Sequence, residues 1–182
     1  MLIRLASIAE GRGDDEAAFR HYAAARARGI DAADVRFVYG AMLLSRGEFR
    51  KAREELEAVV ARLPEHVAVL NNLALAHLGE GGSVASALRH AKKAAGLAPD
   101  DPRLSDTLGW VLLANGKAGE AVRVLTASAA ALDTPESRYH LGAALAEMGR
   151  TEDARAKLSK ALREAPEASW AKDAAKRLNA LR

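Results

Sequence analysis

Small and apolar positions recur along the whole chain at a nearly constant interval. In each occurrence a small residue is followed seven positions later by glycine, and successive occurrences are 34, 34, 35 and 33 residues apart. Each small residue follows an apolar residue, and an alanine recurs twelve or thirteen positions after it. Self-similarity at this interval is typical of stacked helical repeats. The pairs are Ala6/Gly13, Gly40/Gly47, Ala74/Gly81, Gly109/Gly116 and Gly142/Gly149.

Each recurring position has a physical role in a pair of helices. We expect the small residue and the later alanine where the two helices cross, since a larger side chain there would separate them. The glycine ends the first helix, because it adopts the left-handed conformation without a Cβ clash. Asp101-Pro102 and Thr134-Pro135 predict helix starts, each an N-cap followed by proline at the first helical position. Asp31, with Asp34 three residues on, is a weaker form of the same start signal.

Two of the units carry the fullest pattern. The fourth has Leu108-Gly109, Leu112, Gly116, Ala121 and Leu125, and the fifth has Leu141-Gly142, Leu145, Gly149, Ala154, Leu158, Ala161 and Pro166. This order and spacing resembles the tetratricopeptide repeat (TPR), a helix–turn–helix of 34 residues. The resemblance covers essentially the whole chain. It implies an all-α fold, a right-handed superhelical α-solenoid of TPR repeats.

The spacing divides the chain into five repeats and a tail. We predict repeats over 1–32, 33–66, 67–101, 102–134 and 135–167, and a capping helix over 168–182. Trp170, Ala174, Leu178 and Leu181 lie at helical spacing in the tail. Lys176 stands where a sixth repeat would need glycine or alanine.

Three units depart from the common pattern. One extra residue within 79–83 predicts a longer and looser turn in the third repeat. The fourth repeat is one residue short and closes with Asp133 instead of proline. The first lacks its opening residue or two, so we read the chain as a piece of a longer array or an array with a trimmed start.

Composition narrows the class further. The chain has 42 Ala and 24 Leu against 10 Val, 3 Ile and 4 Thr, which argues against a strand-rich fold. It has no Cys, so it has neither disulfides nor a Cys-ligated zinc site. The net charge of +3 arises from 27 basic and 24 acidic residues, a balance that indicates solubility more than a polyanion partner. We expect no membrane span, because no apolar run approaches ~18 residues. The start of the chain does not resemble a signal peptide.

Candidate chemistry is sparse. The five His residues are scattered without metal-ligand spacing, and the glycine-rich stretch 79–83 lacks the Gly-Lys-Ser/Thr ending of a phosphate-binding loop. No serine stands in a Gly-x-Ser-x-Gly context. We therefore expect no enzyme, and no catalytic, cofactor or metal residues.

A partner would bind along the first helices of the repeats. In stacked hairpins these helices face the concave side, and a stripe offset from the small and apolar positions points into the groove. Trp110 and Tyr139 stand out, because the chain is only 4% aromatic. We predict Trp110 as the anchor and polar residues beside it as orienting groups; the alternative is that Trp110 packs as core. The predicted groove residues are Phe37, Asn71, Leu75, Arg103, Asp106, Trp110 and Tyr139.

These features favour a protein-interaction scaffold, a monomer or weak homo-oligomer that holds a protein or peptide segment. One alternative is an RNA-binding helical-repeat module, but the groove mixes Asp34, Asp106 and Glu136 with one Arg, so we expect no nucleic acid. Another is an accessory repeat region of a larger enzyme. A carboxylate clamp for chaperone tails matches at only two of five positions, Asn72 and Arg103.

The chain is also similar to bacterial multi-repeat proteins, some of which serve envelope polysaccharide assembly or protein export. The Ala- and Arg-rich composition fits a bacterial source. Both the cytoplasm and the periplasm stay open as compartments.

Overall fold

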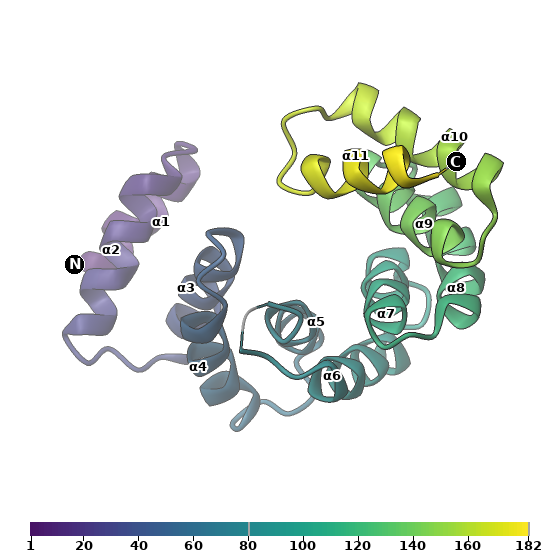
Figure 1. Ribbon diagram of the computed structural model, residues 1–182. Coiled ribbons are helices and arrows are strands. Elements are labelled where there is room, and N and C mark those ends of the chain that lie inside the picture. Colours follow the sequence, from purple (N-terminus) through teal and green to yellow (C-terminus); the bar gives the residue numbers. More distant parts are fainter. Residues whose placement is uncertain (80, 182) are drawn as a thin grey trace. The chain divides into compact units, whose positions relative to one another are not determined.

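The computed structural model describes residues 1–79 and 81–181, and every regular element among them is an α-helix (Figure 1). The predicted all-α class is therefore confirmed. In chain order the helices are α1 (Leu2–Gly11), α2 (Asp15–Ala27), α3 (Ala33–Ser45), α4 (Phe49–Val60), α5 (Val67–Ala76), α6 (Val84–Leu97), α7 (Pro102–Ala114), α8 (Ala118–Leu132), α9 (Pro135–Glu147), α10 (Thr151–Glu164) and α11 (Ala171–Ala180).

The helices form two compact units, which we call unit 1 (Met1–His90) and unit 2 (Ala91–Arg182) and describe separately. In unit 1, α1 packs with α2 and α3 with α4, and α5 rests on α3 and α4. In unit 2, α7 packs with α8 and α9 with α10, and α11 rests on α9 and α10. The boundaries of the five repeats and of the capping segment stay a prediction, and Arg182, the last residue of that segment, lies outside the described residues.

Glycines in the first helices allow the second helices to pack closely. A Cβ on Gly40 would lie 2.9 Å from Leu56 Cγ, and one on Gly142 would lie 2.9 Å from Leu158 Cγ. Both leucines are fully buried. The recurring small residue therefore lies at a helix crossing, as its position in the sequence predicted.

Most of the predicted helix ends are also found. The glycines after the first helices adopt positive φ, for example +74° at Gly47. Asp101 caps α7 through its side chain, and Thr134 forms a capping box at the start of α9. The start signal at Asp31 was wrong: the N-cap of α3 is Ala32, which has no side-chain cap. Asp31 instead pairs with Arg36 and Arg62, and at 3.8 Å with Arg26, so its carboxylate contacts guanidinium groups and not the first backbone N–H groups of α3.

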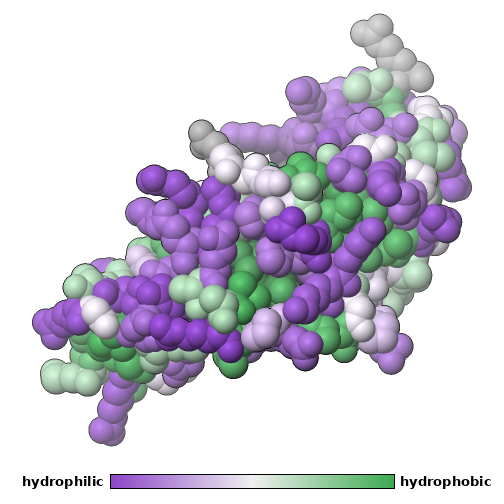
Figure 2. Space-filling view, turned by 90° about the horizontal axis from the view of Figure 1, so that it is seen from below, coloured by the Kyte–Doolittle hydropathy of each residue, from purple (hydrophilic) through white to green (hydrophobic). Residues whose placement is uncertain are grey.

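The core of each unit consists of leucine, valine and alanine between paired helices. In unit 1, Leu43, Leu56 and Leu73 are fully buried. In unit 2 the buried cluster of α9, α10 and α11 includes Tyr139 and Ala174. Trp170, Leu178 and Leu181, the apolar stripe of the tail, pack against this cluster. Polar side chains cover most of the face seen in Figure 2, with apolar side chains in smaller patches between them.

Two further expectations concern the turn and the membrane. The predicted loose turn at 79–83 includes Glu80, which lies outside the described residues. Directly before Glu80, a Cβ added to Gly79 would lie 2.0 Å from Phe49 Cγ, so glycine is required at position 79. None of the described helices is long and apolar enough to cross a membrane.

Candidate partner-binding site

The seven predicted groove residues belong to both units. Phe37, Asn71 and Leu75 lie in unit 1. Their side chains are partly buried, and the Phe37 ring lies 5.2 Å from the ring of His66. The Oδ1 atom of Asn71 is buried and has no hydrogen-bond partner among the described residues.

In unit 2, two predicted groove residues are interior residues. Asp106 is 8% exposed and Tyr139 is 4% exposed, so neither offers a free surface to a partner. Their direct contact with a partner stays a prediction, and in this structure both side chains are covered. The reason is the neighbouring helices: α9 covers Asp106 with His140, and the connection into α11 covers Tyr139 with Trp170.

Arg103 is the exposed member of this group, but it is used locally. Its guanidinium pairs with Asp101, and Asp101 also accepts the backbone N–H of Arg103 at the start of α7. The side-chain hydrogen bond from Arg103 and then the backbone bond lower the pKa of Asp101. Arg103 thus reinforces a helix cap.

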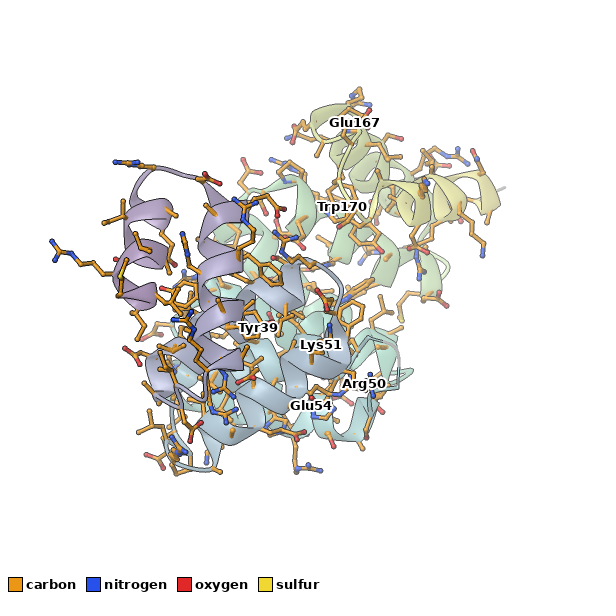
Figure 3. All side chains as sticks on the ribbon, turned by 90° about the vertical axis from the view of Figure 1, so that its left-hand side faces the viewer. Tyr39, Arg50, Lys51, Glu54, Glu167 and Trp170 are labelled. Carbon is orange, nitrogen blue, oxygen red and sulfur yellow. The ribbon has the colours of Figure 1, made fainter. Side chains whose placement is uncertain are left out.

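Trp110 lies between other aromatic rings. Its ring stacks on His140 at 4.4 Å between centroids, and the Tyr139 ring lies 5.3 Å away. Tyr139 in turn stacks on Trp170 at 4.9 Å, with only 7° between the ring planes. Figure 3 shows Trp170 beyond Glu167, where the chain approaches α11. We call these four rings the aromatic column; they fix the Trp110 ring from two directions.

Polar contacts hold the column in place. His140 Nδ1 lies 2.6 Å from Asp106 Oδ2, and both side chains are buried. Tyr139 donates its hydroxyl hydrogen to Asp173 at 2.8 Å. Burial, and then this hydrogen bond, raise the pKa of Tyr139 far above its usual value. Sequence reasoning missed the roles of His140 and Asp173. The sequence feature that could have indicated these roles is the spacing: His140 and Asp173 each lie 34 residues, the length of one repeat, after the residue that they contact.

Arg177 of α11 completes the polar layer. Its Nε donates to Asp173 at 2.6 Å and its Nη1 donates to Glu147 at 3.0 Å. Burial alone would raise the pKa of Asp173, but the hydrogen bonds from Arg177 and Tyr139 outweigh it and lower that pKa. Asp173 therefore stays ionised and links α9 to α11.

A half-open pocket of about 430 Å³ lies beside the Trp110 ring. Its lining combines the indole of Trp110 and small or apolar residues with the Arg177–Glu147 ion pair. We call it the Trp110 pocket. Its lining residues are Trp110, Leu113, Ala114, Gly116, Ala118, Glu147 and Arg177. Among residues 1–79 and 81–181, no group of three or more His, Asp or Glu side chains is placed to hold a metal ion.

Comparison with protein families decides the class of this chain. The tetratricopeptide repeat family model matches residues 42–102 and 107–169. The chain belongs to the tetratricopeptide repeat family. The repeat assignment and the α-solenoid class predicted from the sequence are therefore confirmed, and this fold is one of protein-interaction scaffolds.

Individual TPR proteins resemble the chain over different lengths. The TPR repeat-containing protein PA4667 of Pseudomonas aeruginosa is 30% identical over 111 residues, which is 60% of this chain and 19% of that protein. The chain therefore spans about a fifth of the length of this curated relative.

Solved TPR structures match the chain nearly end to end. The thermophilic TPR protein TTC0263 of Thermus thermophilus has a TM-score of 0.72 at 25% identity, covering 99% of this chain and 96% of that one. YrrB, described as a TPR protein with an unusual peptide-binding site, has a TM-score of 0.64 at 20% identity. That match covers 96% of this chain and 90% of YrrB, and it shows the shared fold.

Proposed function

We propose that this TPR chain is a scaffold whose Trp110 pocket receives a bulky apolar side chain from a protein or peptide partner. The observation that carries the proposal is the position of the Trp110 ring: partly buried, stacked on His140 and facing a half-open pocket. Tryptophan in a largely desolvated pocket is the side chain most enriched among residues that dominate binding energy.

The aromatic column makes this pocket a prepared site. An aromatic ring already fixed by its neighbours loses little conformational entropy when a partner binds, so more of the contact energy appears as affinity. Asp106 and Tyr139 therefore act as positioning residues: Asp106 holds His140 against the indole, and the Tyr139 ring contacts both the indole and His140. The pocket volume of about 430 Å³ lies within the range of ordinary ligand sites.

The remaining predicted residues extend the proposal without sharing this pocket. Phe37, Asn71 and Leu75 offer partly exposed side chains in unit 1. A longer partner segment would use them as a second contact. A place in bacterial envelope export or polysaccharide assembly is the setting that the resemblance to multi-repeat proteins suggests.

The test is to select peptides from a phage-displayed random library on the full chain and to measure their dissociation constants by fluorescence anisotropy. Replacing Trp110 with alanine should raise Kd about thirtyfold, since truncation of such an anchor costs about 2 kcal/mol or more. Ala118→Leu should also weaken binding, because it fills the pocket and leaves the column intact. Leu97→Ala is the control, an exposed apolar truncation in the same unit outside the pocket.

These measurements distinguish a role of Trp110 in binding from a role in the hydrophobic core. Circular dichroism should show the helicity of the parent in all three variants. Loss of helicity in Trp110→Ala would identify Trp110 as a core residue, and the Ala118→Leu result would then decide the pocket. Parent affinity in both folded pocket variants would place the contact surface elsewhere on the chain.

A further inference from the structure

A second groove lies in unit 2, lined by α8, α9, α10 and their connections. Its volume is about 380 Å³, and none of its lining residues belongs to the Trp110 pocket. Its floor includes the buried Leu141 and Leu145 of α9, and its sides carry charged residues of α10. We call it the α8–α10 groove. Its lining residues are Thr126, Ala129, Ala130, Asp133, Arg138, Leu141, Leu145, Arg150, Asp153, Lys157 and Lys160.

The same place in unit 1, between α2, α3 and α4, contains a closed ion-pair network. Glu55 of α4 lies at its centre: its carboxylate accepts hydrogen bonds from Arg26 Nε at 2.9 Å and from Arg36 Nη1 at 2.7 Å. Asp31 pairs with Arg36 and Arg62 at the end of the network. The side chains of Arg26, Arg36 and Glu55 are 14 to 18% exposed, so the network fills this space.

The repeat interval matches these positions one to one with the α8–α10 groove. Arg36 and Arg138 lie four residues before the crossing glycines, Gly40 and Gly142. Counted from the same glycines, Asp31 corresponds to Asp133, Arg62 to Glu164 and Glu55 to Lys157. Counted from the turn glycines that precede α2 and α8, Gly13 and Gly116, Arg26 corresponds to Ala129.

Two of these exchanges open the network in unit 2. Arg138 still pairs with the residue five positions before it, Asp133, and also with Glu164 of α10. However, Lys157 stands where Glu55 provides the central carboxylate, and Ala129 stands where Arg26 fills the space. In the part of the chain that the structure describes, Lys157 has no ion-pair partner. Glu164 supplies Arg138 with the carboxylate that Glu55 supplies to Arg36. Lys157 is therefore the cation of the groove that is left without an ion pair among the described residues.

We propose that the α8–α10 groove binds an acidic segment of a partner protein, which supplies Lys157 with the carboxylate partner that it lacks among the described residues. The carboxylate would pair with Lys157 and lie in the field of Arg138, which is 7% exposed at its side chain. Apolar side chains of the segment would contact Ala129, Leu141 and Leu145. A peptide fits better than a nucleic acid, because the lining has no aromatic ring on which a base could stack.

The charges agree with this occupant. The lining has four cations, Arg138, Arg150, Lys157 and Lys160, against two carboxylates, Asp133 and Asp153. Counting Glu164, which pairs with Arg138 and Lys160, one positive charge is left over. An incoming carboxylate neutralises this charge, and the attraction should weaken with added salt because Arg150, Lys157 and Lys160 are exposed.

The test uses a fluorescein-labelled, end-capped peptide, Ala-Glu-Leu-Glu-Glu-Leu-Glu-Ala, and the same peptide with Gln in place of Glu. Fluorescence anisotropy with the full chain should show binding of the acidic peptide that weakens with salt, and at least tenfold weaker binding of the Gln peptide. Lys157→Glu should raise Kd for the acidic peptide about tenfold or more, and Lys157→Ala by less. The double variant Ala129→Arg/Lys157→Glu should abolish binding and keep the fold, because it rebuilds the unit 1 network.

Lys172→Glu is the matched control, since it makes the same charge change at an exposed residue of α11 outside the groove. It should leave Kd within about twofold of the parent, as expected for a remote surface charge under screening. Equal losses in Lys157→Glu and Lys172→Glu would overturn the proposal, as would a parent chain that binds neither peptide or both alike. Tighter binding of a labelled oligouridine, lost in Lys157→Glu alone, would overturn it in favour of a nucleic acid.

Discussion

Replacing Gly109 with alanine gives a direct test of the helix crossing in unit 2. Gly109 lies in α7, and a Cβ added to it would lie 2.5 Å from Leu125 Cγ and 2.7 Å from Leu125 Cδ2. Leu125 is fully buried, so its branch point has no free space into which it can move. The two helices must separate or Leu125 must leave its rotamer.

The magnitude follows from two opposed effects. Overpacking of a buried site destabilises by about 1–3 kcal/mol, and a contact this short places Gly109→Ala near the upper end. Alanine gains about 1 kcal/mol over glycine in a helix interior. The free energy of unfolding should therefore fall by about 2 kcal/mol. Gly96→Ala in α6 is the matched control: no heavy atom lies within 4 Å of its Cβ, so it should stabilise by up to about 1 kcal/mol.

Urea denaturation measures both variants. Tryptophan fluorescence reports unit 2, since Trp110 and Trp170 both belong to it, and circular dichroism reports the whole chain. The denaturation midpoint should fall for Gly109→Ala and rise for Gly96→Ala, at unchanged slope. A rise in both variants would show that Leu125 does not pack on α7 as closely as described, and the assignment of the small positions to crossings would fail.

Three further predictions concern ionisation and the tail. Because the folded pKa of Asp173 is lowered, the stability it contributes should be lost as pH falls below about 4; in Asp173→Asn the acid-side decline measured by thermal melting should be shallower. Burial and a hydrogen bond to Glu10 raise the pKa of Tyr22 to about 12, so the free energy of unfolding should fall as pH rises from about 10 towards 12. Tyr22→Phe should reduce this decline; an unchanged pH profile would contradict the burial of the Tyr22 hydroxyl. Deleting residues 168–182 should expose the Tyr139 ring and cause earlier melting or self-association by light scattering, whereas a monomer with parent melting would show that α11 stabilises nothing.

The fold was predictable because the backbone requirements recur at a fixed interval. Gly40 lies at a close helix crossing that has no room for a Cβ, and Gly47 adopts a left-handed backbone conformation. Glycine meets both requirements, so the residue type alone indicates the structure at these positions. Asp31 could not be assigned in this way. It is a residue type that caps helices, but its carboxylate pairs with Arg36 of α3 and with Arg62, which lies beyond the end of α4. Arg62 is 31 residues away in the sequence, so only the folded chain brings it to Asp31.

The surroundings of Trp110 could not be predicted from the sequence. The stripe of groove positions includes Trp110, Asp106 and Tyr139 together, because it is counted along each helix alone and does not show which of them a neighbouring helix covers. The burial of Asp106 and Tyr139 depends on His140 and Trp170, which lie one repeat away and in the connection to the last helix. Polar and aromatic pairs at the repeat interval are the sequence signal that would have found them.

The same interval also explains how one repeat family supports different surfaces within a single chain. Residues that set the backbone must match from repeat to repeat, because each hairpin packs on the next with the same geometry. Residues between the second helices have no such requirement, so Glu55 and Lys157 occupy equivalent positions with opposite charge. In unit 1 the charge is matched internally by Arg26 and Arg36, and the surface is closed. In unit 2 the charge of Lys157 has no ion-pair partner among the described residues. The charge of the partner segment therefore determines what the proposed groove accepts, whereas the fold is the same in both units.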